Sequence, residues 1–184
     1  MLSFTSSLSS DSEALVIFVN EKYGYKDRRG ILSKDVSQKV NAYLANLKGK
    51  KEEEELSSFD ISNKKKCFII KVKNKYENNS PQEKGGSFFA NLKHYKKINK
   101  VDIYLDSLDF DSAKLVSFFS KFVFGLNLKS YTFNKYKTLN KEKINKKVSF
   151  KIISSHKEKI KKEYKYYDAI KEGVFLTRDL VSEP

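Results

Sequence analysis

The sequence predicts a three-layer α/β/α domain that ends in a long helix. Segments typical of strands alternate with segments typical of helices along all 184 residues. Because parallel strands joined by helices form a sheet that is covered on both faces, this order favours an α/β architecture. Hydrophobic residues make up 39% of the chain and include 14 Phe and 11 Tyr, which is enough for a substantial core. The length suits one domain with an appended helix.

The first predicted strand covers residues 14–19, Ala-Leu-Val-Ile-Phe-Val, where every position is apolar. Such a run is typical of a strand buried on both faces, in the centre of an α/β sheet. Ser33 is then predicted as the N-cap of a helix that extends to about Leu47. The acidic residues 52–55 are expected to form a solvated loop, and the next strand is predicted over 66–72.

A second helix is predicted to begin at Ser80-Pro81-Gln82-Glu83. Ser at the N-cap, Pro at the first helical position and Glu at the third form a helix-start signature, and the helix should extend to about Lys97. Gly85 and Gly86 lie in its first turns, where each costs about 1 kcal/mol relative to alanine. We interpret the pair as a place of close packing against a neighbouring helix, because the longer patterns of phosphate-binding loops are missing.

The third predicted strand covers residues 101–105, where apolar and polar residues alternate. A helix follows from Asp111 to about Phe124, with three Phe on its apolar stripe, and Gly125 is predicted to end it. A fourth strand is predicted over 147–153, where apolar and polar residues again alternate.

The last predicted helix begins at the capping box Ser155-His156-Lys157-Glu158 and extends to about Val181. Apolar residues at helical spacing predict one buried stripe along it. That stripe comprises Ile160, Tyr164, Tyr167, Ile170, Val174, Thr177 and Val181. The helical pattern continues to Ser182-Glu183-Pro184, and a proline after a helix marks the turn toward a next element. We therefore expect this chain to be the front part of a longer protein.

The net charge of +14 suggests a nucleic-acid partner. However, only three of the 37 basic residues are Arg, whose planar side chain makes most specific contacts with bases and phosphates. Tyr131, Phe133 and Tyr136 lie among lysines and could stack on bases. We interpret the charge mainly as compositional and keep a nucleic-acid-binding module as the alternative function.

No catalytic, cofactor-binding or metal-binding residue is predicted in this chain. His94 and His156 lie among lysines and lack a spaced partner such as HExxH, so both are interpreted as surface residues. Cys67, the only cysteine, lies in an apolar run and is expected to be buried. The best carboxylate cluster comprises Asp102, Asp106, Asp109 and Asp111. Asp102 is predicted within a strand, whereas Asp109 and Asp111 lie where a helix N-cap is expected, so helix capping is the preferred explanation.

Two segments carry a resemblance to a known family. Residues 125–137 read Gly-Leu-Asn-Leu-Lys-Ser-Tyr-Thr-Phe-Asn-Lys-Tyr-Lys and are similar to the G-x-x-L-x-x-Y-x-F-x-x-Y-K run of leucyl aminopeptidases, the cytosol aminopeptidase or M17 family. Residues 173–184, with Arg-Asp-Leu-Val at 178–181, resemble the helix that joins the two domains of those enzymes. The resemblance is specific over the last third of the chain, whereas over 1–110 only the order of elements agrees.

The resemblance implies a macro-domain-like mixed sheet over residues 1–154 and an interdomain linker helix over residues 155–184. It also implies that the full-length enzyme is a two-metal aminopeptidase that releases N-terminal amino acids, preferably Leu, from peptides. The two divalent metals, Mn or Zn, and their ligands would belong to a catalytic domain after Pro184. This fragment alone, with no cofactor of its own, is expected to be inactive.

The implied partners are the chain's own catalytic domain and the sister subunits of a homo-hexamer, in which the N-terminal domain helps assembly and restricts access to the active sites. Without that catalytic domain, Leu176, Leu180 and Val181 are expected to be exposed. Residues 1–12 lack the features of a signal peptide, and no apolar run is long enough for a membrane span, so a cytoplasmic location is expected. The alternative is a basic macro-like module that binds nucleic acid, as some relatives bind DNA, or ADP-ribose.

Overall fold

The computed structural model describes residues 2–49, 54–133 and 148–183. Its elements, in chain order, are β1 (Leu2–Thr5), β2 (Ala14–Val19), α1 (Lys34–Lys48), β3 (Leu56–Ser62), β4 (Lys65–Lys71), α2 (Ser80–Leu92), β5 (Lys100–Tyr104), the 3-10 turn η1 (Leu105–Ser107), α3 (Ser112–Ser130), β6 (Ser149–Ile153) and α5 (Lys157–Ser182).

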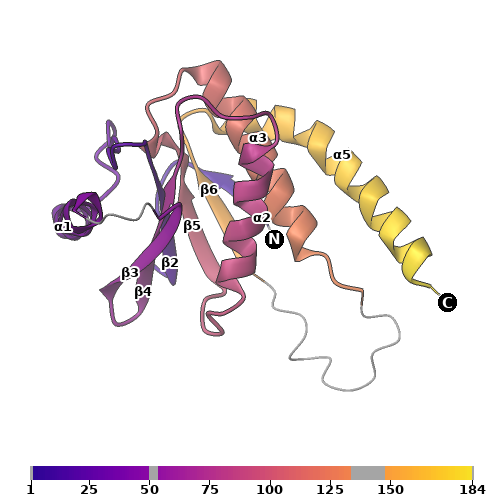
Figure 1. Cartoon of the computed structure of the whole chain (residues 1–184), viewed down its shortest axis with the longest axis horizontal. Helices are drawn as coiled ribbons and strands as arrows, with labels where there is room; N and C mark the ends of the chain where they lie inside the picture. The colour runs from indigo at the N-terminus through magenta and orange to yellow at the C-terminus, as the bar shows by residue number, and fades with distance from the viewer. Residues whose placement is uncertain (1, 50–53, 134–147, 184) are drawn as a thin grey trace.

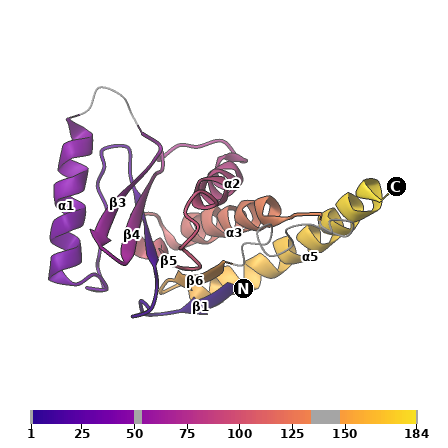
Figure 2. The same ribbon diagram turned by 90° about the horizontal axis from the view of Figure 1, so that it is seen from below.

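The strands form one six-stranded mixed sheet in the order β1-β6-β5-β2-β4-β3. All neighbours are parallel except β3, which runs antiparallel to β4 at one edge. Helix α1 covers one face of the sheet, and α2, α3 and α5 cover the other (Figures 1 and 2). The predicted three-layer α/β/α architecture with a long C-terminal helix is confirmed.

The central strands follow the predicted pattern. All six residues of β2 are buried between β4 and β5, as the continuous apolar run 14–19 predicts. The predicted strand 66–72 corresponds to β4, and 101–105 corresponds to β5. In β5 the alternation does not mark an exposed face, because Asp102 is buried with its apolar neighbours.

Two strands were not predicted from the sequence, and both lie at the edges of the sheet. The first, β1, has only four residues and pairs with β6, which lies near the other end of the chain. The second, β3, reads Leu-Ser-Ser-Phe-Asp-Ile-Ser and is too polar to show a strong strand pattern. Of the acidic loop predicted just before β3, residues 52 and 53 lie outside the described part of the chain.

Helix starts were predicted with mixed success. Ser33 accepts a bond of 3.3 Å from the backbone N–H of Val36 and caps α1 as predicted. The predicted N-cap of α2 is wrong by one residue, because Asn79 occupies that position without a side-chain bond, and the helix ends at Leu92 rather than Lys97. The capping box predicted for α5 does not form, because His156 is the N-cap and makes no side-chain capping bond.

Helices α2 and α3 cross at two glycines. A Cβ atom at Gly85 would lie 2.0 Å from the backbone oxygen of Phe122, and one at Gly125 would lie 1.9 Å from the backbone oxygen of Gln82. The close-packing interpretation of Gly85 is therefore confirmed. The prediction that Gly125 ends its helix is wrong, because α3 continues to Ser130.

The core has two parts, one on each face of the sheet. On the face covered by α2, α3 and α5, the Phe18 ring makes edge contacts with the rings of Phe118, Phe119 and Phe122. The smaller part lies under α1 and contains Cys67, which is buried as predicted. No helix in the described ranges is long and apolar enough to cross a membrane.

Candidate functional site

The four carboxylates of the predicted cluster lie apart and bind groups of the chain itself. Asp111 caps α3, since its carboxylate accepts a bond of 2.9 Å from the N–H of Lys114, as predicted. The buried carboxylate of Asp102 instead accepts a bond of 2.7 Å from the N–H of Ser9, so it fixes the segment between β1 and β2.

The other two carboxylates also have structural roles. Asp106 accepts a bond of 2.6 Å from the hydroxyl of Ser154 and thereby connects η1 to the end of β6. Asp109 forms ion pairs with Lys26 and, at 2.7 Å, with Arg28, and the hydrogen bond from Lys26 holds the pKa of that carboxyl below its usual value. The capping interpretation is thus correct for Asp111 but wrong for Asp109, and Asp102 lies within a strand as expected.

In open α/β sheets, ligands bind where the connections leave two adjacent parallel strands in opposite directions. Here that place is the carboxyl end of β2 and β5, and residues 20–33 lie across it. Asp27 accepts bonds from the Tyr104 hydroxyl (2.8 Å) and from the N–H groups of Ile31 and Leu32 (both 2.9 Å). Burial and this bond raise the pKa of Tyr104.

A second set of hydrogen bonds lies at the same end of the sheet, beside the carboxyl end of β5. The hydroxyl of Ser107 accepts from the N–H of Phe18 and donates to the carbonyl of Tyr104, both at 2.9 Å. The carbonyl of Ser107 accepts a bond of 2.9 Å from the N–H of Lys26. The chain's own hydrogen bonds therefore hold the segment 20–33 at the carboxyl ends of β2 and β5.

The described residues contain no group of three or more His, Cys, Asp and Glu placed to hold a metal ion. His94 is exposed and His156 is half-buried. Burial raises the pKa of the Cys67 thiol, which makes it a poor nucleophile. The described residues therefore do not fit a two-metal site.

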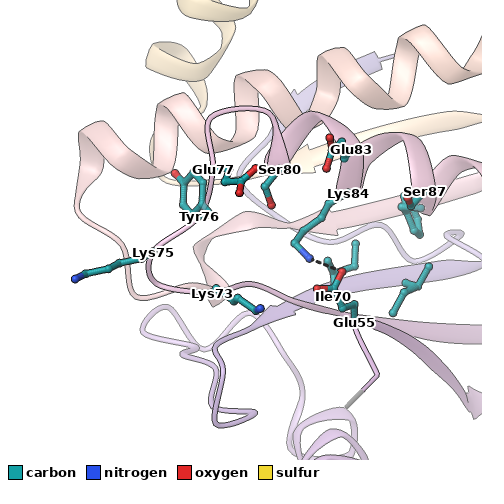
Figure 3. Close-up of a pocket in the computed structure, with 12 residues that line it drawn as sticks. Glu55, Ile70, Lys73, Lys75, Tyr76, Glu77, Ser80, Glu83, Lys84 and Ser87 are labelled. Atoms are coloured by element: carbon teal, nitrogen blue, oxygen red, sulfur yellow. Dashed lines mark hydrogen bonds and ion pairs between the residues drawn. The ribbon is translucent and has the colours of Figure 1, made fainter. Parts of the chain in front are cut away.

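A cavity of about 460 Å³ lies between the ends of β3 and β4 and the first turns of α2 (Figure 3). Its charged lining residues are three lysines and three glutamates, so it offers no excess charge to an ionic ligand. They are Lys73, Lys75, Lys84, Glu55, Glu77 and Glu83. The Lys84 ammonium forms an ion pair of 3.0 Å with Glu55 (Figure 3). Gly85 packs against α3, so the Gly85-Gly86 pair is no phosphate-binding loop.

The two segments that resemble the aminopeptidase family contact each other. The Tyr131 hydroxyl, at the end of α3, donates a bond of 2.7 Å to Asp179 of α5, and Arg178 donates a bond of 2.9 Å to the carbonyl of Leu128. The Arg178 guanidinium lies 5.4 Å from the centre of the Tyr131 ring. The centres of the Phe175 and Tyr131 rings lie 5.1 Å apart. Tyr136 and Lys137, which also belong to the resemblance, lie outside the described residues.

Helix α5 carries two faces. Its inner face packs on the domain through the buried side chains of Ile160 and Tyr164 and, further along, through Phe175. The predicted stripe is therefore correct at its start and at the half-buried Val174, but beyond residue 167 its other members are exposed. There Ile170 and Val181 point to solvent, while Lys171, Phe175 and Arg178 are partly buried.

We call the solvent-exposed side the outer face of α5. Its large exposed side chains are Tyr166, Ile170, Leu176, Leu180 and Val181. The predicted exposure of Leu176, Leu180 and Val181 is confirmed. The C-terminal half of the helix extends beyond the sheet (Figures 1 and 2), so this face is open to a partner.

Comparison with curated proteins finds cytosol aminopeptidases. A probable cytosol aminopeptidase of Agrobacterium fabrum is 38% identical over 94 residues, which are 50% of this chain and 18% of that protein. A probable cytosol aminopeptidase of Phytoplasma mali is 37% identical over 103 residues, which are 54% of this chain and 20% of that protein. The match thus spans about a fifth of the relatives' length. No protein-family model matches the chain.

Solved structures show the same fold. A mutant of tomato leucine aminopeptidase superposes with a TM-score of 0.71 at 16% identity, covering 100% of this chain and 38% of that one. The bottromycin maturation enzyme BotP in complex with Mn gives 0.58 at 10% identity, covering 94% and 32%. The macrodomain of Thermus aquaticus DarG gives 0.52 at 12% identity, covering 84% and 98%.

Proposed function

From the homology of this chain to the N-terminal region of cytosol aminopeptidases, we propose that it is the non-catalytic N-terminal domain of a leucyl aminopeptidase. The observation that carries the proposal is the sequence match at 37–38% identity to two curated members of that group. The superposition of the whole chain on tomato leucine aminopeptidase supports the same assignment at the level of the fold.

We divide the chain into a macro-like domain, residues 1–154, and a linker helix, residues 155–184. The division is supported by the last strand, which ends at Ile153, and by α5, which begins at Lys157 and extends past the sheet (Figure 1). The bonds between Tyr131 and Asp179 and between Arg178 and Leu128 then set the direction in which the linker leaves the domain.

The longer enzyme would be a two-metal aminopeptidase that releases N-terminal amino acids, preferably Leu, from peptides. Its Mn or Zn ions and their ligands would belong to a separate catalytic domain, and the Mn in BotP supports that choice of metal. The domain described here would help assemble a hexamer in the cytoplasm and restrict access to the active sites, with no chemistry of its own.

A chimera tests this proposal. Residues 1–184 replace the matching N-terminal segment of the Phytoplasma mali relative, and hydrolysis of leucine p-nitroanilide is measured with added Mn²⁺, together with the sedimentation coefficient. We expect the chimera to keep the activity and assembly of the relative, whereas the isolated 184-residue chain has no activity with Mn²⁺ or Zn²⁺.

The controls are the unaltered relative and a version of it without the N-terminal segment. Hydrolysis by the isolated chain would contradict a non-catalytic role. A folded chimera that matches the shortened relative in both activity and assembly would contradict the assignment as its N-terminal domain.

The alternative is a basic macro-like module that binds nucleic acid or ADP-ribose, and its support is the net charge of +14. Titration with ADP-ribose, and with a duplex oligonucleotide at several salt concentrations, tests this alternative. Submicromolar affinity that falls steeply with salt would favour the alternative, because that slope counts phosphate contacts.

A further inference from the structure

A second cavity, of about 630 Å³, lies at the end of the sheet opposite to residues 20–33. Its walls come from residues 10–13 before β2, residues 62–66 around the turn between β3 and β4, and residues 95–98 between α2 and β5. The strands β2 and β4 are parallel neighbours, so their amino ends meet at this edge of the sheet. The volume lies within the range of about 300–1,000 Å³ that is typical of small-molecule sites.

The charged side chains of this cavity are unbalanced, unlike those of the cavity in Figure 3. Five lysines and three carboxylates line it. The lysines are Lys64, Lys65, Lys66, Lys96 and Lys97, and the carboxylates are Asp11, Glu13 and Asp60. We call it the lysine cavity. Its excess positive charge favours a negatively charged ligand.

The three carboxylates of the lysine cavity already bind groups of the chain. Asp60 forms an ion pair of 2.7 Å with Lys66. Asp11 forms an ion pair of 2.6 Å with Lys100, which does not line the cavity. Glu13 accepts a bond of 3.0 Å from the backbone N–H of Lys100. Of the five lysines of the cavity, only Lys66 is therefore neutralised by these carboxylates.

Three lysines of the cavity have no partner within the part of the chain that the structure describes. The ammonium groups of Lys64, Lys96 and Lys97 form neither an ion pair nor a hydrogen bond there. The ammonium of Lys65 donates a bond of 2.6 Å to the hydroxyl of the buried Ser12, which fixes it at the wall. Positive charges that share one cavity repel each other, and a bound anion would remove this repulsion.

We propose that the lysine cavity binds a small ligand that carries two or more phosphate groups. One phosphate group carries about 1.5–2 negative charges near pH 7, so the unpaired charges of Lys64, Lys96 and Lys97, together with Lys65, match two phosphates better than one. Lysine binds phosphate as a compact point charge, so such a site does not need arginine. The proposal goes beyond the proposed function and does not depend on it.

Isothermal titration calorimetry of the 184-residue chain with tripolyphosphate, in about 0.15 M salt, tests the proposal. We expect one ligand per chain and a dissociation constant on the order of 10–100 μM. Inorganic phosphate should bind at least about tenfold more weakly, because it neutralises fewer lysines. A nucleoside triphosphate that binds more tightly than tripolyphosphate identifies a nucleotide as the ligand, whereas equal or weaker binding identifies an inorganic polyphosphate. Both results support the proposal.

Two variants with the same net charge separate the cavity from the charge of the whole chain. The cavity variant carries Lys64→Gln, Lys96→Gln and Lys97→Gln, and should bind tripolyphosphate at least about tenfold more weakly. The control variant replaces three exposed lysines at the start of α5 and should keep the affinity within about twofold, because salt screens distant charges. Its substitutions are Lys161→Gln, Lys162→Gln and Lys165→Gln.

Amide chemical shifts of the unaltered chain locate the ligand without any substitution. Tripolyphosphate should shift the signals of residues 10–13, 62–66 and 95–98 and leave those of residues 157–165 unchanged. No binding at millimolar tripolyphosphate overturns the proposal, as do equal losses of affinity in the two variants or shifts centred on α5. A duplex oligonucleotide that shifts the cavity signals when tripolyphosphate does not would assign these lysines to nucleic acid and overturn a small ligand. Circular dichroism verifies that both variants are folded.

Discussion

The hydroxyl of Tyr131 donates a hydrogen bond of 2.7 Å to the carboxylate of Asp179 and so joins the end of α3 to the end of α5. The ring of the same tyrosine contacts Phe175 and Arg178. Arg178 adds a bond to the carbonyl of Leu128, and the side chains of Leu180 and Val181 that follow are exposed. These contacts therefore help to set the direction of the C-terminal helix.

Tyr131→Phe should loosen the end of α5 while the rest of the domain stays folded. The variant loses one hydrogen bond but keeps the ring contacts, so we expect a loss of about 1 kcal/mol or less. Amide hydrogen exchange should become faster in residues 175–182 and stay unchanged in β2. Tyr166→Phe, on the outer face, is the matched control. Equal exchange in both variants would contradict the role of the Tyr131 bond.

Gly85→Ala and Gly125→Ala should each strongly destabilise the domain. The added methyl groups would lie 2.0 Å and 1.9 Å from backbone oxygens, so α2 and α3 must move apart. We expect a loss of about 3 kcal/mol or more in urea unfolding. Gly86→Ala is the control, because its nearest neighbour would lie 3.8 Å away and alanine favours the helix. A mild effect at both crossing glycines would show that the helices do not cross so closely.

Asp27→Ala should destabilise the carboxyl end of the sheet. The substitution removes the acceptor of the buried Tyr104 hydroxyl and of two backbone N–H groups, so we expect a loss of about 2–3 kcal/mol. In a Tyr104→Phe background the loss should be smaller, because one of the donors is gone. Asp35→Ala, which removes only an exposed ion pair with Lys39, should cost less than about 0.5 kcal/mol. Additive effects of Asp27→Ala and Tyr104→Phe would contradict this coupling.

The stability of the domain should decrease between pH 10 and pH 12 through Tyr164. Burial, with the nearby charge of Asp168, raises the pKa of Tyr164 to about 12 from an ordinary value of 10. The folded state therefore keeps this proton longer than the unfolded chain, and its contribution is full below pH 10 and is lost as the pH rises to about 12. The free energy of unfolding of Tyr164→Phe should fall less steeply over this range. Parallel curves for the two proteins would contradict the assignment.

The sequence predicts the parts of this fold that local pattern determines. The apolar run of β2 and the N-caps Ser33 and Asp111 lie where they were predicted, because burial on two faces and capping act within a few residues. The strands β1 and β3 could not be predicted, since neither has a strong pattern and each depends on a partner strand. Gly125 was misread because a glycine that ends a helix and one that admits a neighbouring helix look alike in sequence.

The contact between the two segments that resemble the aminopeptidase family could not be predicted from local sequence either. The segments around Tyr131 and Arg178 stand out in the sequence, but their contact depends on α5 lying along α3, which no local pattern encodes. Beyond residue 167 the predicted stripe of α5 was wrong at Ile170, Thr177 and Val181, because the helix has apolar residues on two sides. Only the tertiary contacts of Phe175 and Arg178 distinguish the inner face from the outer one.

The edge strand β1 has a consequence for how the chain is made. Among the described strands its residues pair only with β6, from Leu2 beside Phe150 to Thr5 beside Ile153, so most of the sequence separates the two strands. The N-terminal residues leave the ribosome first, and their partner strand is absent until β6 has been synthesised. Such a distant pairing is slow to form, so β1 should join the sheet late in folding. A bulky tag fused before Leu2 should slow the pairing of β1 with β6, whereas a tag after α5 should not affect it.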